Sequence, residues 1–173
     1  MKYILAIIIS IFSITSFAKT GYEDILTLNT SNWLSQKTPT GFGLTCKLCD
    51  NQLMVSVDIV PVNKSNPYTK SNADFISYIM KDKDDFAIKM ASDAAMGGKI
   101  QLIKTGKAKI NNKDAFRYVF IANTGLTKTF DNTSLLLHKN KMIKITLNYF
   151  DGHFSQKDRA QVGALYKSIK FTP

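Results

Sequence analysis

The chain has 173 residues, of which 45% are hydrophobic and 21% are charged, and its formal net charge is +10 at pH 7. This length and apolar fraction allow one globular domain with a hydrophobic core, and they exclude an intrinsically disordered chain. Only two of the 23 basic residues are arginines, Arg117 and Arg159. Nucleic-acid surfaces favour the planar arginine side chain, so we expect no nucleic-acid partner.

The first 18 residues have the pattern of a secretory signal peptide. Lys2 supplies the positive charge, residues 3–14 form an apolar run interrupted by two serines, and a Ser-Phe-Ala cleavage pattern ends at Ala18. The run is shorter than the roughly 18 residues of a transmembrane helix. We therefore expect cleavage between Ala18 and Lys19, which leaves a single domain at residues 19–173. This domain would lie in the Gram-negative periplasm without a membrane anchor.

The N-terminal part of this domain predicts a short apolar run, a polar loop and a strand. Residues 25–28 form the apolar run. The polar loop is expected around Trp33, Pro39, Gly41 and Gly43. After it, residues 53–59 alternate between apolar and other side chains, which is typical of a half-buried strand. Pro61 either ends this strand or places it at a sheet edge.

Residues 71–98 predict one long helix. The apolar positions follow a helical period, with Lys83 as the one polar break: Ala73, Ile76, Ile79, Met80, Phe86, Ala87 and Met90. Ser71 or Asn72 can cap its start, and Gly97-Gly98 ends it. We interpret Asp82, Asp84 and Asp85 as a solvated helix face, because a calcium loop needs ligands at alternate positions and a glycine turn.

The C-terminal part predicts a meander of strands and a final helix. Residues 99–110 give one or two short strands, residues 116–121 alternate as a strand, and residues 134–150 form a hairpin. A capping box of Ser155 and Asp158 begins the last helix. The order of elements indicates an α+β fold with a mainly antiparallel sheet of about six to seven strands and two main helices.

This order resembles the Mog1/PsbP-like fold, which includes DcrB-like envelope proteins of Gram-negative bacteria. The resemblance covers nearly the whole mature chain and is carried by four stretches: TLNTSNW, KIQLIKTGKAKINNKDAFRYVF, LLLHKNKMIKITLNYF and ALYKSIKFTP. The family has no shared catalytic residues, and its members are mostly binding modules. The resemblance therefore implies a binding surface, with no enzymatic activity and no cofactor. Cys46 and Cys49 are not part of the family pattern.

The cysteine pair Cys46 and Cys49 admits three interpretations. A redox-active pair needs a helix after the second cysteine, whereas a predicted strand follows here. A zinc site needs four ligands, and only His138 and His153 are available as further partners, without ligand spacing. A structural disulfide suits the oxidising periplasm and would fix a local turn. We favour the disulfide, and the redox and metal interpretations stay open.

The leading functional hypothesis is an exported, non-catalytic module that binds a periplasmic protein in an immunity-, inhibitor- or envelope-accessory-like role. Its binding surface is expected to include Lys47, Leu48 and Trp33. No Gly-x-Ser-x-Gly elbow or phosphate-binding glycine loop indicates an enzyme. Two alternatives are a thiol-redox or metal-handling protein that uses Cys46 and Cys49, and a weak binder of envelope polyanions through its lysines.

Overall fold

The structure is a computed structural model, and it describes residues 22–63, 65, 67–94, 98–123, 125, 127–150 and 154–173. The expected cleavage site between Ala18 and Lys19 therefore lies outside the described residues, as does His153. The elements follow in this order: β1 (Leu26–Thr27), β2 (Trp33–Lys37), β3 (Gly41–Cys46), β4 (Leu53–Pro61), the 3-10 turn η1 (Pro67–Thr69), α1 (Asn72–Ile79), the 3-10 turn η2 (Met80–Asp82), α2 (Lys83–Ala94), β5 (Lys99–Ile110), β6 (Lys113–Asn123), β7 (Lys128–His138), β8 (Lys141–Phe150), α3 (Gln156–Ser168) and β9 (Lys170–Phe171).

Most strands form one seven-stranded sheet in the order β2-β3-β4-β8-β7-β6-β5, and every pairing in it is antiparallel. A second sheet joins β1 to β9, with Leu26 opposite Phe171, so it ties the start of the described chain to its end. The predicted α+β class with a mainly antiparallel sheet is confirmed. In the described ranges, no helix is both long enough and apolar enough to cross a membrane.

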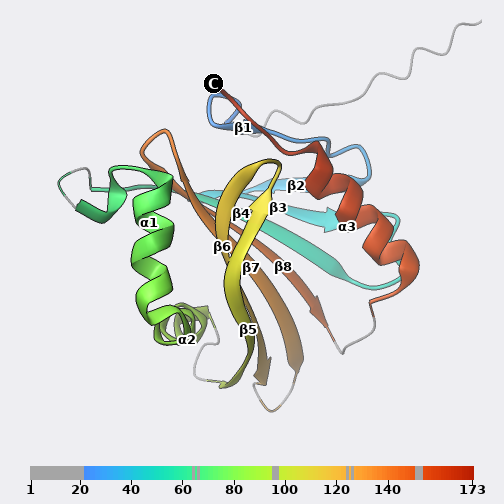
Figure 1. Ribbon diagram of the computed structural model, residues 1–173. Helices are drawn as coiled ribbons and strands as arrows, with labels where there is room; N and C mark the ends of the chain where they lie inside the picture. Colours follow the sequence, from blue (N-terminus) through green and yellow to red (C-terminus); the bar gives the residue numbers. More distant parts are fainter. Residues whose placement is uncertain are drawn as a thin grey trace, which may run out of the picture.

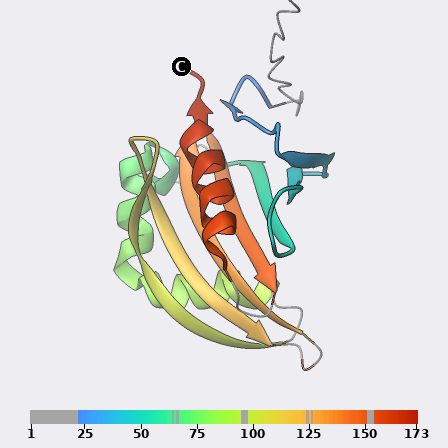
Figure 2. The same ribbon diagram turned by 90° about the vertical axis from the view of Figure 1, so that its right-hand side faces the viewer.

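Helices cover the two faces of the large sheet separately. Helices α1 and α2 lie on one face, and α3 lies on the opposite face together with the small sheet (Figures 1 and 2). Each layer encloses its own apolar core. The α3 core includes Leu44, Val57, Ile145, Leu165 and Ile169. The α1–α2 core includes Phe75, Ile79, Phe116, Phe120 and Leu135.

The two cores explain an unbroken apolar run in β7. Successive residues of a strand point to opposite faces of a sheet. Leu136 accordingly belongs to the α3 core, whereas Leu135 and Leu137 belong to the α1–α2 core. All three leucines are buried, so this strand is apolar on both faces instead of alternating.

The expectation of a polar loop around Trp33, Pro39, Gly41 and Gly43 is wrong. This segment is the hairpin of β2 and β3, which pair from Trp33 opposite Cys46 to Lys37 opposite Phe42. In β2 only Trp33 is buried, and the other four residues are exposed. Strand β2 lies at the sheet edge and is held by backbone pairing, so its side chains carry no alternating signal.

The predicted single helix is also interrupted. The 3-10 turn η2 separates α1, which buries Phe75, Ile76 and Ile79, from α2, and the two helices run in different directions (Figure 1). Lys83, the polar break in the apolar pattern, follows this bend. Its Nζ donates to Thr105 Oγ1 of β5 at 3.0 Å, and Asp84 also bonds this hydroxyl. Ser71 is the N-cap, as expected, and its Oγ accepts from Asp74 N at 3.1 Å.

Candidate functional site: the Cys46–Cys49 loop

The loop between β3 and β4 contains both cysteines. Cys46 ends β3, and its Sγ lies 1.94 Å from Sγ of Cys49, with the two Cα atoms 5.6 Å apart. We call residues 46–51 the disulfide loop. With both sulfur atoms bonded to each other, neither cysteine offers a thiolate to a metal. Within the described ranges there is also no group of three or more His, Cys, Asp or Glu side chains that could hold a metal ion.

A buried carboxylate ties the disulfide loop to the start of α3. Asp158 is the third helical residue and is fully buried. Its Oδ1 accepts from Asp50 N at 2.8 Å, and its Oδ2 accepts from Asn51 Nδ2 at 2.6 Å. The same Oδ2 accepts from Ser155 N at 3.0 Å, which completes the predicted capping box. We call this set of contacts the loop–helix latch.

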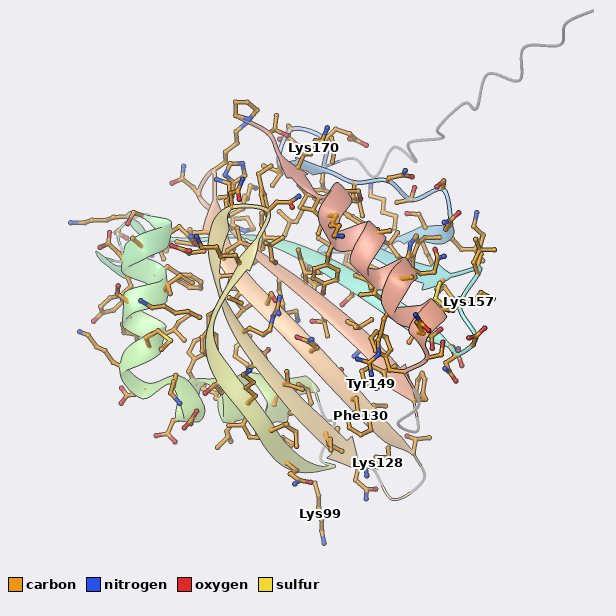
Figure 3. All side chains as sticks on the ribbon, turned by 45° about the vertical axis from the view of Figure 1, so that its right-hand side comes forward. Lys99, Lys128, Phe130, Tyr149, Lys157 and Lys170 are labelled. Atoms are coloured by element: carbon orange, nitrogen blue, oxygen red, sulfur yellow. A yellow bond between two sulfur atoms is a disulfide. The ribbon has the colours of Figure 1, made fainter. Side chains whose placement is uncertain are left out.

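Asp50 adds an exposed layer to the latch. Its carboxylate accepts from Ser155 Oγ at 2.7 Å and from Lys157 Nζ at 3.2 Å, and Lys157 lies at this end of α3 (Figure 3). These two bonds lower the pKa of Asp50. Burial raises the pKa of Asp158, but the hydrogen bonds from Asn51, Ser155 and Asp50 outweigh burial and lower it overall. Both carboxylates are therefore ionised at neutral pH.

The structure separates the three residues expected on the binding surface. Lys47 and Leu48 are exposed at the tip of the disulfide loop, and Leu48 is 47% exposed. Trp33 is only 5% exposed and packs in the α3 core, so its expected place on the surface is corrected. Trp33 is buried because it lies opposite Cys46 on the sheet face that α3 covers.

His138 belongs to a different part of the molecule from the cysteines. It ends β7, and its Nε2 donates to the carbonyl of Thr172 at 2.8 Å. Burial lowers the pKa of His138, with the Thr172 contact acting in the opposite direction. His138 therefore fastens the C-terminal residues to β7, and it shares no contact with the disulfide loop.

A second buried carboxyl group, that of Asp131 in β7, lies on the α1–α2 side of the sheet. Asp131 is 7% exposed, and it accepts from Thr129 Oγ1 at 3.1 Å and from Asn148 Nδ2. Burial raises the pKa of Asp131, and the bond from Thr129 compensates only partly. The folded protein therefore favours the protonated form of this group more than the unfolded chain does.

Replacing Asp131 with asparagine should stabilise the protein at pH 7. A folded-state pKa above the unfolded value means that stability is fully present below the unfolded pKa and falls as pH rises through the folded pKa. Asparagine cannot ionise, so this loss disappears. Urea denaturation should show that the free energy of unfolding of Asp131→Asn exceeds that of the wild type at pH 7, and that this gain vanishes at pH 3.5. An equal gain at both values would mean that ionisation of Asp131 is not the cause.

Comparison with known proteins identifies only structural relatives. No family model and no curated protein matches the sequence. The solved structures of similar fold include cyanobacterial PsbP from Synechocystis sp. PCC 6803, with a TM-score of 0.52 and 15% identity over 92% of this chain and 95% of that one. They also include the Ran-binding protein Mog1p of Saccharomyces cerevisiae, with a TM-score of 0.54 and 10% identity over 86% and 91% of the two chains.

Two further structures come from bacteria. LpqN of Mycobacterium tuberculosis, described as involved in cell envelope biogenesis, has a TM-score of 0.50 and 8% identity over 86% of this chain and 84% of that one. A protein from Bacteroides thetaiotaomicron VPI-5482 has a TM-score of 0.55 and 10% identity, and this chain spans only 45% of its length. At such identities the likeness concerns the fold alone. The chain has the Mog1/PsbP-like fold that its sequence resembles.

Proposed function

We propose that this chain is a non-catalytic accessory protein that acts in the periplasm after loss of residues 1–18 and binds another protein through the disulfide loop. An immunity-, inhibitor- or envelope-accessory-like role fits this proposal. Two of the structural relatives support it in a general way, since Mog1p is described as Ran-binding and LpqN as involved in envelope biogenesis. The single observation that carries the proposal is an exposed leucine, Leu48, on a loop that is fixed from both sides.

The rigidity of the loop is what makes Leu48 a suitable anchor. The disulfide between Cys46 and Cys49 closes the loop across its tip, and Asp158 holds the next two residues, Asp50 and Asn51. The backbone N of Lys47 also donates to Asn32 O at 3.0 Å. A preorganised loop loses little conformational entropy on binding, so an apolar side chain at its tip contributes more of its burial free energy to affinity.

Site-specific photo-crosslinking in exporting cells tests the proposal. A photo-reactive amino acid at position 48 should give one dominant adduct with another protein. The matched control is position 88 in α2, since Ile88 is 45% exposed and Leu48 is 47% exposed. We expect no adduct of the same mass at position 88. Equal adducts at both positions, or none at position 48, would remove the support for a loop contact.

Two variants separate the proposal from a thiol or metal function. With the partner identified by the crosslink, Leu48→Asp should weaken its binding about tenfold or more, the effect of losing a buried anchor of roughly 1.4 kcal/mol. The double variant Cys46→Ser/Cys49→Ser should weaken binding only moderately, because the hydrogen bonds to Asp158 and Asn32 still hold the loop when the disulfide is absent. Complete loss of function in the double variant, with Leu48→Asp unaffected, would favour the thiol or metal function.

A further inference from the structure

One part of the α3-side sheet face lies beyond the helix. The strand register places three rows of side chains there, and we call them the open sheet face: Lys99, Asn123 and Lys128; Gln101, Ile121, Phe130 and Tyr149; Lys104, Val119 and Asn132. The third row ends at Leu147, which is buried in the α3 core. Lys99, Lys128, Phe130 and Tyr149 lie on this face below α3 (Figure 3). The lysines are exposed, and the two rings are half-buried.

Aromatic side chains form a continuous row at one side of this face. Phe130 and Tyr149 stack with ring centroids 5.0 Å apart, and Tyr149 stacks on Phe154 at 5.2 Å. A cation lies over each end of the row. Lys128 Nζ is 5.6 Å from the Phe130 centroid, and Arg159 Cζ is 5.3 Å from the Phe154 centroid. Stacking and cation–π contacts hold these rings in fixed orientations.

The charge of the open sheet face has one sign. Its three rows contain Lys99, Lys104 and Lys128 and no carboxylate, and Arg117 occupies the next row beside Lys104. None of the ion pairs between described residues involves these four cations. Arg117 instead donates from Nε to Ser134 Oγ at 3.1 Å. Cations gathered without counter-charges favour a negatively charged partner.

The apolar side chains at the centre of the face indicate which class of negatively charged partner it binds. Ile121, Phe130 and Val119 are half-buried side chains between the lysines. A polysaccharide or a nucleic acid would meet the lysines but would bring no aliphatic side chains to cover this centre. A polypeptide with alternating acidic and apolar residues matches both features, because its apolar side chains can pack on the rings while its carboxylates reach the surrounding lysines.

We propose that the open sheet face binds an acidic, amphipathic segment of a partner protein. Apolar side chains of this segment pack on Ile121, Phe130 and Tyr149, and its carboxylates pair with the lysines around them. The inference goes beyond the proposed loop contact, because it assigns a second surface and the chemistry of what that surface binds. It does not depend on Leu48.

Fluorescence anisotropy with a defined probe tests this inference. The probe is a short fluorescein-labelled peptide of alternating glutamate and leucine, titrated with the exported, purified protein. The variant Lys104→Glu/Lys128→Glu should weaken binding about tenfold or more, and binding should fall as salt is raised. The matched control is Lys81→Glu/Lys167→Glu, which makes the same charge change at two exposed lysines elsewhere, one in the 3-10 turn η2 and one in α3. It should change affinity by less than about twofold.

Further probes and variants make each outcome decisive. Polyglutamate without leucine and a heparin fragment should bind clearly more weakly than the probe, and equal binding would replace the proposal with a polyanion site. Phe130→Ala, with folding checked by circular dichroism, should weaken binding of the probe but not binding of the heparin fragment. Leu48→Asp should leave probe binding unchanged, so failure here and failure of the loop contact are distinguishable. Absence of probe binding, or equal weakening by the control variant, would overturn the inference.

Discussion

Replacing Asp158 with alanine should lower the free energy of unfolding by about 3 kcal/mol at pH 7. The side chain is fully buried and accepts hydrogen bonds from Asp50 N, Asn51 Nδ2 and Ser155 N. Alanine removes the acceptor of all three donors together with half of the capping box. Urea denaturation monitored by circular dichroism measures the loss. The latch would also loosen, so amide exchange in the disulfide loop should become faster.

The pH dependence of this loss gives a second check on Asp158. Its hydrogen bonds lower the pKa below the unfolded value. The stability that it contributes is therefore fully present above the unfolded pKa and is lost as pH falls through the folded pKa. The difference between wild type and Asp158→Ala should be constant near neutral pH and should shrink below about pH 4. A difference that persists unchanged at pH 2 would contradict an ionised latch.

Asp50→Ala is the matched control for the latch. Asp50 contacts the same capping residue, Ser155, but its carboxylate is exposed to solvent. Its ion pair with Lys157 joins two exposed side chains, with 56% and 49% of their surfaces accessible. Exposed pairs of this kind contribute about 0–1 kcal/mol. A loss in Asp50→Ala as large as that in Asp158→Ala would mean that burial is not what distinguishes the two carboxylates.

Replacing Gly41 with alanine should prevent folding or cost more than about 4 kcal/mol. A Cβ atom at position 41 would lie 1.8 Å from the carbonyl oxygen of Val57 and 2.9 Å from its carbonyl carbon. Both atoms are backbone atoms of β4. They cannot move aside easily, because Val57 is opposite Phe42 on one side and Ile145 on the other. The yield of folded protein and its urea midpoint measure the effect.

Two other glycines serve as controls for Gly41. At Gly43, two residues further along β3, the nearest atom to an added Cβ is Gln36 O at 4.0 Å, so alanine should cost less than about 1 kcal/mol. At Gly163 in α3 an added Cβ meets nothing within 4 Å. Gly163→Ala should therefore stabilise the protein by about 0.5–1 kcal/mol, since alanine favours helix. If Gly41→Ala unfolds at the same urea concentration as Gly43→Ala, the close approach to β4 is not rigid.

Local signals in the sequence predict much of this fold. The alternation in residues 53–59 becomes β4, the hairpin around residues 139–141 becomes β7 and β8, and the Ser155–Asp158 capping box begins α3. Each of these features depends on residues close together in the chain. Strand β2 and the bend at η2 do not depend on nearby residues. Strand β2 forms because it pairs at the sheet edge, and the bend forms because two helices pack on one sheet. Their causes lie in distant residues.

The same distinction applies to the candidate site. The spacing of Cys46 and Cys49 predicts a turn-closing disulfide, and the capping box singles out Asp158. Nothing in the sequence links Asp158 to Asp50 and Asn51, which are 108 and 107 residues away. That link exists only because α3 crosses the sheet next to the β3–β4 loop. The burial of Trp33 could not be predicted either, since it depends on which half of the sheet α3 covers.

Successive leucines of β7 are buried in different cores, and this has a consequence for how the protein unfolds. Leu136 is part of the α3 core, and its neighbours Leu135 and Leu137 are part of the α1–α2 core. Neither helical layer can leave the sheet without exposing one side of this strand, so the layers are coupled through a single backbone. The chain should therefore unfold as one cooperative unit. The amide protons in the centre of β7 would exchange with solvent only when the whole domain opens.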